Sequence, residues 1–187
     1  IHGGYGWEQG TLDTGDTRRL NGLVAGGQVG FNYLIGSQWF VGAEIDSAYA
    51  AIKNATIIVD SGFPHSTASD FEQNKYLGSA RLRTGIAMDR YLIFVTGGGA
   101  WLLNNMEIGH NGLTPAAGAV ILTDQHLHTG WTAGGGIETV LAGNWTARFE
   151  YLFARLGRQT YTFDQPQPFG VRIDAQLVRF GLNYFFK

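Results

Sequence analysis

The chain has 187 residues and a mass of 20.4 kDa, enough for a substantial core, and we expect one domain over residues 1–187. Aromatic residues make up 13% of the chain, charged residues only 15%, and 28 residues are glycine. This composition disfavours both a disordered chain and a helical bundle. The formal net charge of -2 gives no basic footprint, so we expect no nucleic-acid partner.

Apolar runs in the chain are too short for a membrane-spanning helix, which needs about 20 apolar residues. The segment Tyr91 to Leu103 is interrupted by Thr96 and by three consecutive glycines at 97–99. The sequence starts without the charged and apolar segments of a secretion signal, so we expect that any such signal has been removed. The absence of cysteine suits a chain that crosses an oxidising compartment and needs no disulfide.

Alternation of apolar and polar residues recurs along the chain, between segments rich in turn residues. It predicts eight strands, at about 1–9, 20–34, 39–50, 72–88, 91–103, 125–141, 145–157 and 173–186. The connections are alternately long (10–19, 51–71, 104–124, 158–172) and tight (35–38, 89–90, 142–144). This predicts an all-β fold, an eight-stranded antiparallel up-and-down transmembrane β-barrel with its tight turns on the periplasmic side.

The two faces of each predicted strand differ in chemistry. A soluble barrel of the lipocalin type keeps apolar residues inside, and a membrane barrel turns them outward. Here the polar face is rich in glycine, poor in lysine and balanced in charge, which favours a closed lumen with paired charges over a solvated surface. The predicted lumen network consists of Glu44, Asp46, Arg81, Arg83, Glu138, Arg148, Glu150 and Arg179. The alternative is that some of these charges are solvated.

Aromatic residues recur at an interval that fits a bilayer. Trp39 and Tyr49 lie ten positions apart on the apolar face, as do Tyr91 and Trp101, and ten tilted residues rise roughly 25 Å. We therefore predict a periplasmic girdle of Tyr33, Trp39, Tyr91, Trp145, Tyr184 and Phe186, and an outer girdle of Trp7, Tyr49 and Trp101. The simpler alternative is that aromatic residues favour strands in general.

Four segments of the predicted strands carry a family resemblance: Gly3–Trp7, Gly26–Tyr33, Phe40–Asp46 and Arg179–Phe186. Together they resemble the alphaproteobacterial Omp25/Omp31-like (outer immunogenic protein) outer-membrane β-barrel family. The resemblance covers nearly the whole barrel and leaves out the loops. It implies a location in the bacterial cell outer membrane, contact with lipid and lipopolysaccharide, and a role as a surface antigen. It also implies porin-like activity and, in some members, hemin binding.

The histidines are the residues of the sequence that are most suited to bind a metal or a heme. His126 and His128 share one face of a predicted strand, and His110 lies in the loop before it. Two imidazoles at this spacing can both reach a metal or a heme iron. Because no cysteine or acidic ligand motif accompanies them, ordinary polar positions at the barrel rim are the favoured interpretation, and we expect no metal and no cofactor.

An enzyme has to be considered, because small outer-membrane barrels include lipid A acyltransferases and deacylases. Such a site would need a serine, a histidine and an acid within hydrogen-bond reach. The serines of this chain lack a G-x-S-x-G setting, and the histidines cluster elsewhere. We therefore predict that the protein is not an enzyme.

Two segments between the predicted strands are apolar, Ala55–Val59 and Pro115–Leu122. Exposed apolar patches often mark protein contacts. The alternative is that these segments extend the strands beyond the membrane. We interpret the protein as a non-catalytic surface or structural barrel whose loops at 51–71 and 104–124 contact a protein partner or a second copy. A small porin-like channel and a heme- or ligand-binding protein are the alternatives.

Overall fold

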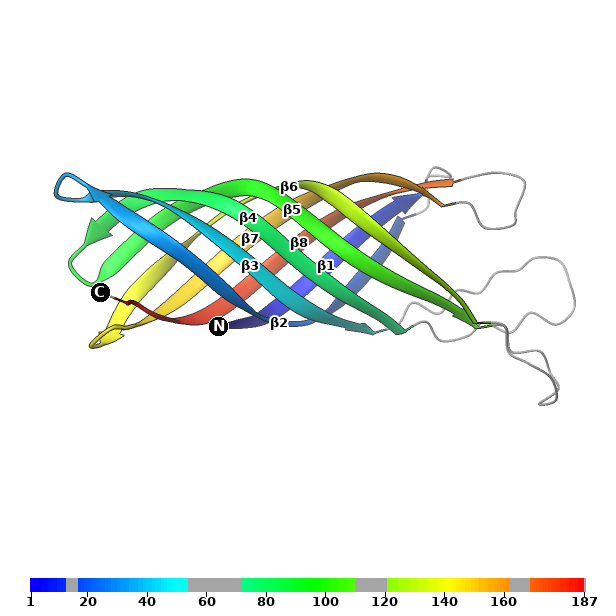
Figure 1. Ribbon diagram of the computed structural model, residues 1–187, viewed down its shortest axis with the longest axis horizontal. Helices are drawn as coiled ribbons and strands as arrows, with labels where there is room; N and C mark the ends of the chain where they lie inside the picture. The colour runs from blue at the N-terminus through cyan, green and yellow to red at the C-terminus, as the bar shows by residue number, and fades with distance from the viewer. Residues whose placement is uncertain (13–16, 54–71, 110–120, 162–168, 187) are drawn as a thin grey trace, which may run out of the picture.

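The computed structural model describes residues 1–12, 17–53, 72–109, 121–161 and 169–186 (Figure 1). Within these ranges the chain forms eight strands: β1 (His2–Leu12), β2 (Thr17–Ile35), β3 (Trp39–Lys53), β4 (Glu72–Met88), β5 (Tyr91–Gly109), β6 (Ile121–Ala142), β7 (Trp145–Tyr161) and β8 (Phe169–Tyr184). None of the residues described belongs to a helix long and apolar enough to cross a membrane.

The strands form a closed ring in chain order, each antiparallel to its neighbours. The ring closes where β1 pairs with β8, from His2 opposite Gly181 to Leu12 opposite Val171. Figure 1 shows the strands inclined to the long axis of the barrel, as closure of a sheet requires. The predicted eight-stranded antiparallel barrel is confirmed.

The tight turns join β2 to β3, β4 to β5 and β6 to β7, and they lie at the end of the barrel that also carries both termini (Figure 1). Gly36 and Gly143 have φ angles of 68° and 56°, a backbone region that glycine enters without a steric penalty. Asp89 is the described non-glycine residue with positive φ, at 46°. These turn residues let the chain reverse its direction within two or three positions.

The strands extend further at the opposite end than the sequence predicted. β5 and β6 stay paired from Asn104 opposite His126 to Gly109 opposite Ile121, so 104–109 and 121–124 are strand and not loop. The pairs Thr11–Thr17 and Tyr161–Phe169 extend β1–β2 and β7–β8 in the same way. The prediction was wrong because it ended each strand where apolar alternation ended, and main-chain pairing needs no apolar face outside a membrane.

The extended strands include part of one of the two apolar segments that the sequence analysis singled out. Ile121 and Leu122 are the first residues of β6, as the strand-extension alternative holds. The segments Ala55–Val59 and 115–120 lie outside the described residues.

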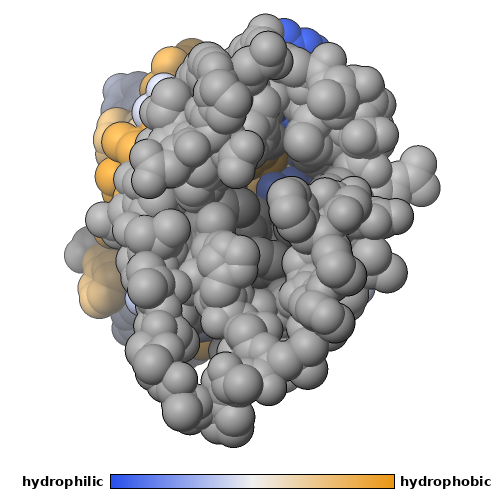
Figure 2. Space-filling model, turned by 90° about the vertical axis from the view of Figure 1, so that its right-hand side faces the viewer, coloured by the Kyte–Doolittle hydropathy of each residue, from blue (hydrophilic) through white to orange (hydrophobic). Residues whose placement is uncertain are grey.

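Large apolar side chains cover the outward face of the barrel, among them Leu23, Val29, Phe31, Leu82 and Phe180. Figure 2 shows hydrophobic residues on the outer wall, at the margin of the view where described residues are visible. The inward face instead carries glycines, charges and a separate set of apolar residues. The outward face is therefore the surface that meets lipid.

Adjacent glycines of β5 provide a test of how closely the wall is packed. A Cβ atom at the inward Gly98 would overlap the main-chain carbonyl oxygen of Ala80 in β4. We expect Gly98→Ala to lower the free energy of unfolding by about 1–3 kcal/mol, because main chain cannot move aside as a flexible side chain can. Urea unfolding in lipid vesicles measures this effect.

The control is the outward Gly99→Ala, whose Cβ would have Gly130 O as its nearest contact, at 4.0 Å. It should change stability by no more than about 0.5 kcal/mol. Equal losses at the two positions would show that the lumen wall is not specially crowded at Gly98.

Candidate functional site in the barrel lumen

The eight charged residues named from the sequence lie on the inward faces of β3, β4, β6, β7 and β8. Each is at most 7% exposed. Strand register places Glu44 opposite Arg81 and Glu150 opposite Arg179, so opposite charges face each other across neighbouring strands. The local cause is the period of two, which sends alternate residues of every strand to the same side.

Glu44 is the centre of the network. Arg148 binds it in a bidentate manner, with Nη1 donating to Oε2 at 2.7 Å and Nη2 donating to Oε1 at 3.0 Å. Arg81 also donates to Oε1, and Nη1 of Arg83 donates to Oε2 at 3.2 Å. One carboxylate therefore joins three guanidinium groups by charge-assisted hydrogen bonds.

A second group of ion pairs surrounds Arg179. Its Nη2 lies 2.5 Å from Glu150 Oε2, and its Nη1 lies 2.8 Å from Asp46 Oδ1. Arg81 contacts the same two acids, at 2.9 Å from Glu150 and 3.1 Å from Asp46. Ser79 donates a further hydrogen bond to Asp46. Arg81 thus connects the two groups of ion pairs.

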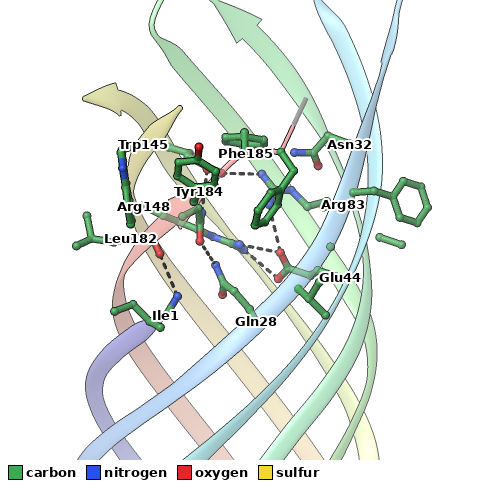
Figure 3. A pocket seen from close by; sticks show the side chains of 17 residues that line it. Ile1, Gln28, Asn32, Glu44, Arg83, Trp145, Arg148, Leu182, Tyr184 and Phe185 are labelled. Atoms are coloured by element: carbon green, nitrogen blue, oxygen red, sulfur yellow. Dashed lines mark hydrogen bonds and ion pairs between the residues drawn. The ribbon is translucent and has the colours of Figure 1, made fainter. Parts of the chain in front are cut away.

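Glu138 ends the network on the side of the tight turns. Arg83 Nη2 lies 3.0 Å from its Oε2. Its Oε1 accepts hydrogen bonds from the Thr146 hydroxyl at 2.5 Å and from the Asn183 amide at 2.9 Å. Gln28 in turn donates to Asn183 at 2.7 Å (Figure 3). All eight charges therefore belong to one connected set.

Two buried phenylalanines pack against the network. The guanidinium carbon of Arg83 lies 4.4 Å from the Phe94 ring centre and 5.4 Å from that of Phe40, and Arg148 lies 4.5 Å from the Phe94 ring centre. These are cation–π distances. Sequence reasoning missed this role of Phe40 and Phe94. The available signal was their inward parity on an otherwise polar face.

A second layer of lumen side chains is apolar, and we call it the apolar plug. It consists of Val24, Ala48, Ala50, Ala100, Leu102, Leu152, Ala154, Leu156, Ile173 and Leu177. Leu77 and Ala175 pack against both halves of it. Along β3 and β7 the plug follows the charged residues in the direction away from the tight turns. A cavity of about 30 Å³ within it has room for about one water molecule.

The sequence did not predict the apolar plug. Leu152 and Leu156 have the same inward parity as Glu150, but the inward face was interpreted as uniformly polar. A closed lumen outside the reach of water can be filled by either chemistry, and the apolar side chains avoid any need for partners.

The predicted girdle aromatics point outward. At the end with the tight turns, Tyr184 contacts Trp145 and Phe186 edge to face, with ring centres 5.2 and 5.1 Å apart. At the other end, Tyr49 contacts Tyr76 at 5.5 Å, and the Trp101 ring covers the position of a Cβ at Gly78. Trp7, Tyr33, Trp39 and Tyr91 are exposed. Their role as membrane anchors stays a prediction.

Of the three histidines named from the sequence, His128 is the one whose side chain the structure describes. His128 is fully buried, and its Nδ1 lies 3.5 Å from the Gly157 carbonyl oxygen. His110 and the side chain of His126 lie outside the described residues. Within the described part of the chain, no three His, Cys, Asp or Glu side chains are grouped closely enough to hold a metal ion.

A ring of eight tilted strands with a charged lumen and an apolar outer face defines a transmembrane barrel of the bacterial outer-membrane class. The family model described as "Outer membrane protein beta-barrel domain" matches residues 1–186, and the chain belongs to this family. It is therefore an outer-membrane protein, in contact with lipid and lipopolysaccharide.

Curated relatives place the chain near the family suggested by its strands. The 31 kDa outer-membrane immunogenic protein of Brucella melitensis is 29% identical over 166 residues, which cover 88% of this chain and 67% of the relative. The 25 kDa outer-membrane immunogenic protein of Brucella abortus is 26% identical over 185 residues, 98% of this chain and 75% of the relative. The resemblance to the Omp25/Omp31-like family is confirmed.

The fold is shared with solved structures of much lower sequence identity. The crystal structure of Neisserial surface protein A has a TM-score of 0.55 at 9% identity, and the match covers 98% of this chain and 95% of that one. A likeness at this identity shows the barrel fold alone.

Arg148 offers a test of the network's contribution to stability. Arg148→Ala removes a guanidinium from Glu44 and Glu150 and leaves two buried carboxylates short of a partner. We expect the free energy of unfolding to fall by about 3–5 kcal/mol, measured by urea unfolding in lipid vesicles.

Arg155 provides the matched control, because it forms an exposed ion pair with Asp174, which lies opposite Gln9, two positions beyond Trp7 of the predicted outer girdle. Water screens such a pair, so Arg155→Ala should leave the urea midpoint close to that of the unaltered protein. Similar midpoints for both variants would mean that water enters the lumen and solvates the charges.

Proposed function

We propose that this protein is a non-conducting, non-catalytic barrel that anchors its long connections at the cell surface, where they contact protein partners or neighbouring copies. The observation that carries the proposal is the charge network, because some of its ion pairs join strands that are not neighbours. Arg148 of β7 pairs with Glu44 of β3, and Arg179 of β8 pairs with Asp46 of β3. Such pairs cross the lumen, and this position supports a closed path.

The apolar plug supports the same proposal independently. Its side chains occupy the lumen beyond the network, and an ion would have to leave water to pass among them. The small size of the cavity within it agrees with a packed layer. Two layers of different chemistry therefore oppose diffusion, which argues against the small porin-like alternative.

The absence of catalysis is part of the proposal. Ser79, a serine of the lumen, donates its hydroxyl hydrogen bond to Asp46 and not to a histidine. Glu44, Asp46, Glu138 and Glu150 are engaged by arginines, so these four carboxylates lack the unpaired, accessible position of a general base. The buried position of His128 likewise gives no support to heme binding.

Contacts made by the surface connections are supported by more general observations. The pairing of β5 with β6 continues to Gly109 opposite Ile121, at the end of the barrel away from the tight turns (Figure 1), and this length of paired strand supports a position of the connections outside the bilayer. The Brucella relatives are named immunogenic outer-membrane proteins, and exposure at the cell surface fits that name. The proposed contact segments are residues 51–71 and 104–124, apart from the strand residues already described.

Planar-bilayer recording tests the closed lumen. We expect the refolded protein to show no steady ion conductance, because both lumen layers block the path. A variant that shortens both layers, Arg148→Gly with Leu156→Ala and Leu177→Ala, should conduct if it folds.

Steady conductance of the unaltered protein would overturn the closed-barrel proposal. If that conductance were lost when Gly134 or Gly136 is replaced by a larger residue, a small porin would be the better description.

Replacement of Val120, Ile121 and Leu122 by serine tests the surface contacts. The main-chain pairs of Ile121 with Gly109 and of Leu122 with Ile108 do not depend on side chains, so folding should persist. We expect unchanged heat-modifiable migration on gels and a weaker oligomer or partner complex, measured by cross-linking in cells.

The control replaces Leu34 and Ile35, exposed apolar residues at the opposite end of the barrel, by serine. It should leave any such complex intact. If the variant at Val120, Ile121 and Leu122 loses its fold while the contacts with partners or copies are unaffected, the segment serves only as barrel strand.

A further inference from the structure

Charged residues on the outward face of the barrel gather on two neighbouring strands, β7 and β8. Both chain neighbours of Arg155 on β7 are buried in the lumen, and so is Ile173, which separates Arg172 from Asp174 on β8. Since successive residues of a strand point to opposite faces, the side chains of Arg155, Arg172 and Asp174 all point outward. Among the outward strand side chains that the structure describes, these three are the charged ones.

These charges lie level with aromatic residues near the predicted outer girdle. Asp174 is opposite Gln9 of β1, two positions beyond Trp7. On the other side, Arg155 is opposite Trp131 of β6, which is 48% exposed. Tryptophan in a membrane protein prefers the level of the lipid headgroups, so the three charges lie where anionic headgroups are within reach.

The guanidinium group of Arg155 is held in a defined position. Its Nε donates to Asp174 Oδ1 at 2.9 Å, and its Nη2 donates to Oδ2 at 3.1 Å. Its central carbon lies 5.6 Å from the ring centre of Phe153, and that ring in turn contacts Trp131. A guanidinium carries five N–H groups, so Asp174 leaves three of those of Arg155 for a further acceptor.

Arg172 gives this face a positive charge in excess. It is exposed, and it lies two positions from Asp174 on the same face of β8. Because Arg155 is directly opposite Asp174, the two arginines are diagonal neighbours, with main chains about 7–8 Å apart. Within the described part of the chain, Asp174 pairs with Arg155, and Arg172 has no acid of its own. Two guanidinium groups and one carboxylate therefore leave one positive charge uncompensated.

A continuous apolar track runs from these charges toward the middle of the bilayer. Phe153, Tyr151 and Phe149 follow Arg155 on the same face of β7. Phe149 contacts Phe180 of β8, with ring centres 4.9 Å apart, and Phe180 is 64% exposed. A ligand of this surface therefore has an anionic group at the headgroup level and hydrocarbon below it, which a free anion or a soluble acidic peptide lacks.

We propose that Arg155 and Arg172 bind a phosphate group of lipid A, the membrane anchor of lipopolysaccharide. Lipid A carries its phosphates and its acyl chains on the same sugars, so one molecule meets both the arginines and the apolar track. Guanidinium groups bind phosphate through charge-assisted hydrogen bonds. Asp174 is a positioning residue, because it holds Arg155 and limits the excess to a single positive charge. Outer-membrane location implies contact with lipopolysaccharide in general, and the proposal assigns that contact to particular residues.

Titration of the refolded protein in detergent micelles with lipid A tests the proposal. One arm uses lipid A with both phosphates, and the other uses the same lipid after removal of its phosphates. Native mass spectrometry of the folded protein gives the apparent Kd for each lipid. We expect the Kd for the dephosphorylated lipid to be higher by roughly tenfold or more, because it lacks the anion that the arginines bind.

Two substitutions that break the same ion pair should change binding differently. Arg155→Gln removes a phosphate contact, so the Kd for phosphorylated lipid A should rise by roughly tenfold or more, and Arg172→Gln should have the same direction. Asp174→Asn removes a negative charge beside the bound phosphate, so the Kd should stay the same or fall. A merely structural role of the ion pair would weaken binding in the Arg155 and Asp174 variants alike.

The matched control is Arg90→Gln, which removes an exposed arginine from the tight turn between β4 and β5, at the opposite end of the barrel. It should leave the Kd for phosphorylated lipid A unchanged. Heat-modifiable migration on gels establishes that each variant is folded before its Kd is compared.

Three results would overturn the proposal. The first is an equal Kd for the two lipids, which would show that the apolar track alone binds. The second is a Kd unchanged by Arg155→Gln combined with Arg172→Gln. The third is displacement of lipid A by an equal concentration of inorganic phosphate, which would identify a site for the free anion. None of these results depends on whether the lumen conducts, so failure here is distinct from failure of the proposed function.

Discussion

The structure depends on the need of every main-chain N–H and C=O group in the bilayer for a partner inside the protein. Strands meet that need only as a ring, so the pairing of β1 with β8 is the condition for the rest of the fold. A closed ring of alternating residues necessarily has two faces, one toward lipid and one toward a narrow lumen. The lumen is too narrow for bulk water, and its side chains must satisfy one another.

The charge network is one solution to that problem. Four acids and four arginines have no net charge, and each arginine contacts at least two acids. Glu138 contacts Arg83 and accepts two further hydrogen bonds, from Thr146 and Asn183. Buried ion pairs recover their desolvation cost only with such geometry. Arg81, Arg83 and Arg148 still leave Nε without a hydrogen bond, and for Arg83 and Arg148 an aromatic face lies close instead. The network therefore links strands that pair with each other and, through Arg81–Glu150, Arg83–Glu138, Arg148–Glu44 and Arg179–Asp46, strands that do not.

Sequence patterns predict the parts of this structure that depend on a period of two. Strand number, antiparallel order and the inward side of Glu44 and Arg148 follow from alternation alone. The ion pair between these two residues does not, because it crosses the lumen from β3 to β7 and depends on strand tilt and stagger. The ends of β5 and β6 were missed because pairing outside lipid leaves no apolar signature, and Leu152 and Leu156 were missed because inward position was equated with polarity.

The charge network and the apolar plug are separate layers along the lumen. We relate the first to the stability of the barrel and the second to the proposed barrier to ions. Ion pairs link distant strands, so the network bears on stability and on strand placement. The apolar plug lies farther from the tight turns and needs no partner for any of its side chains, so the proposed barrier to ions does not depend on the network. Loss of one arginine would then weaken the fold while the barrier to ions persisted. In the closed-barrel proposal, the barrier and the stability of the barrel are therefore separate properties, assigned to different residues of the same inward face.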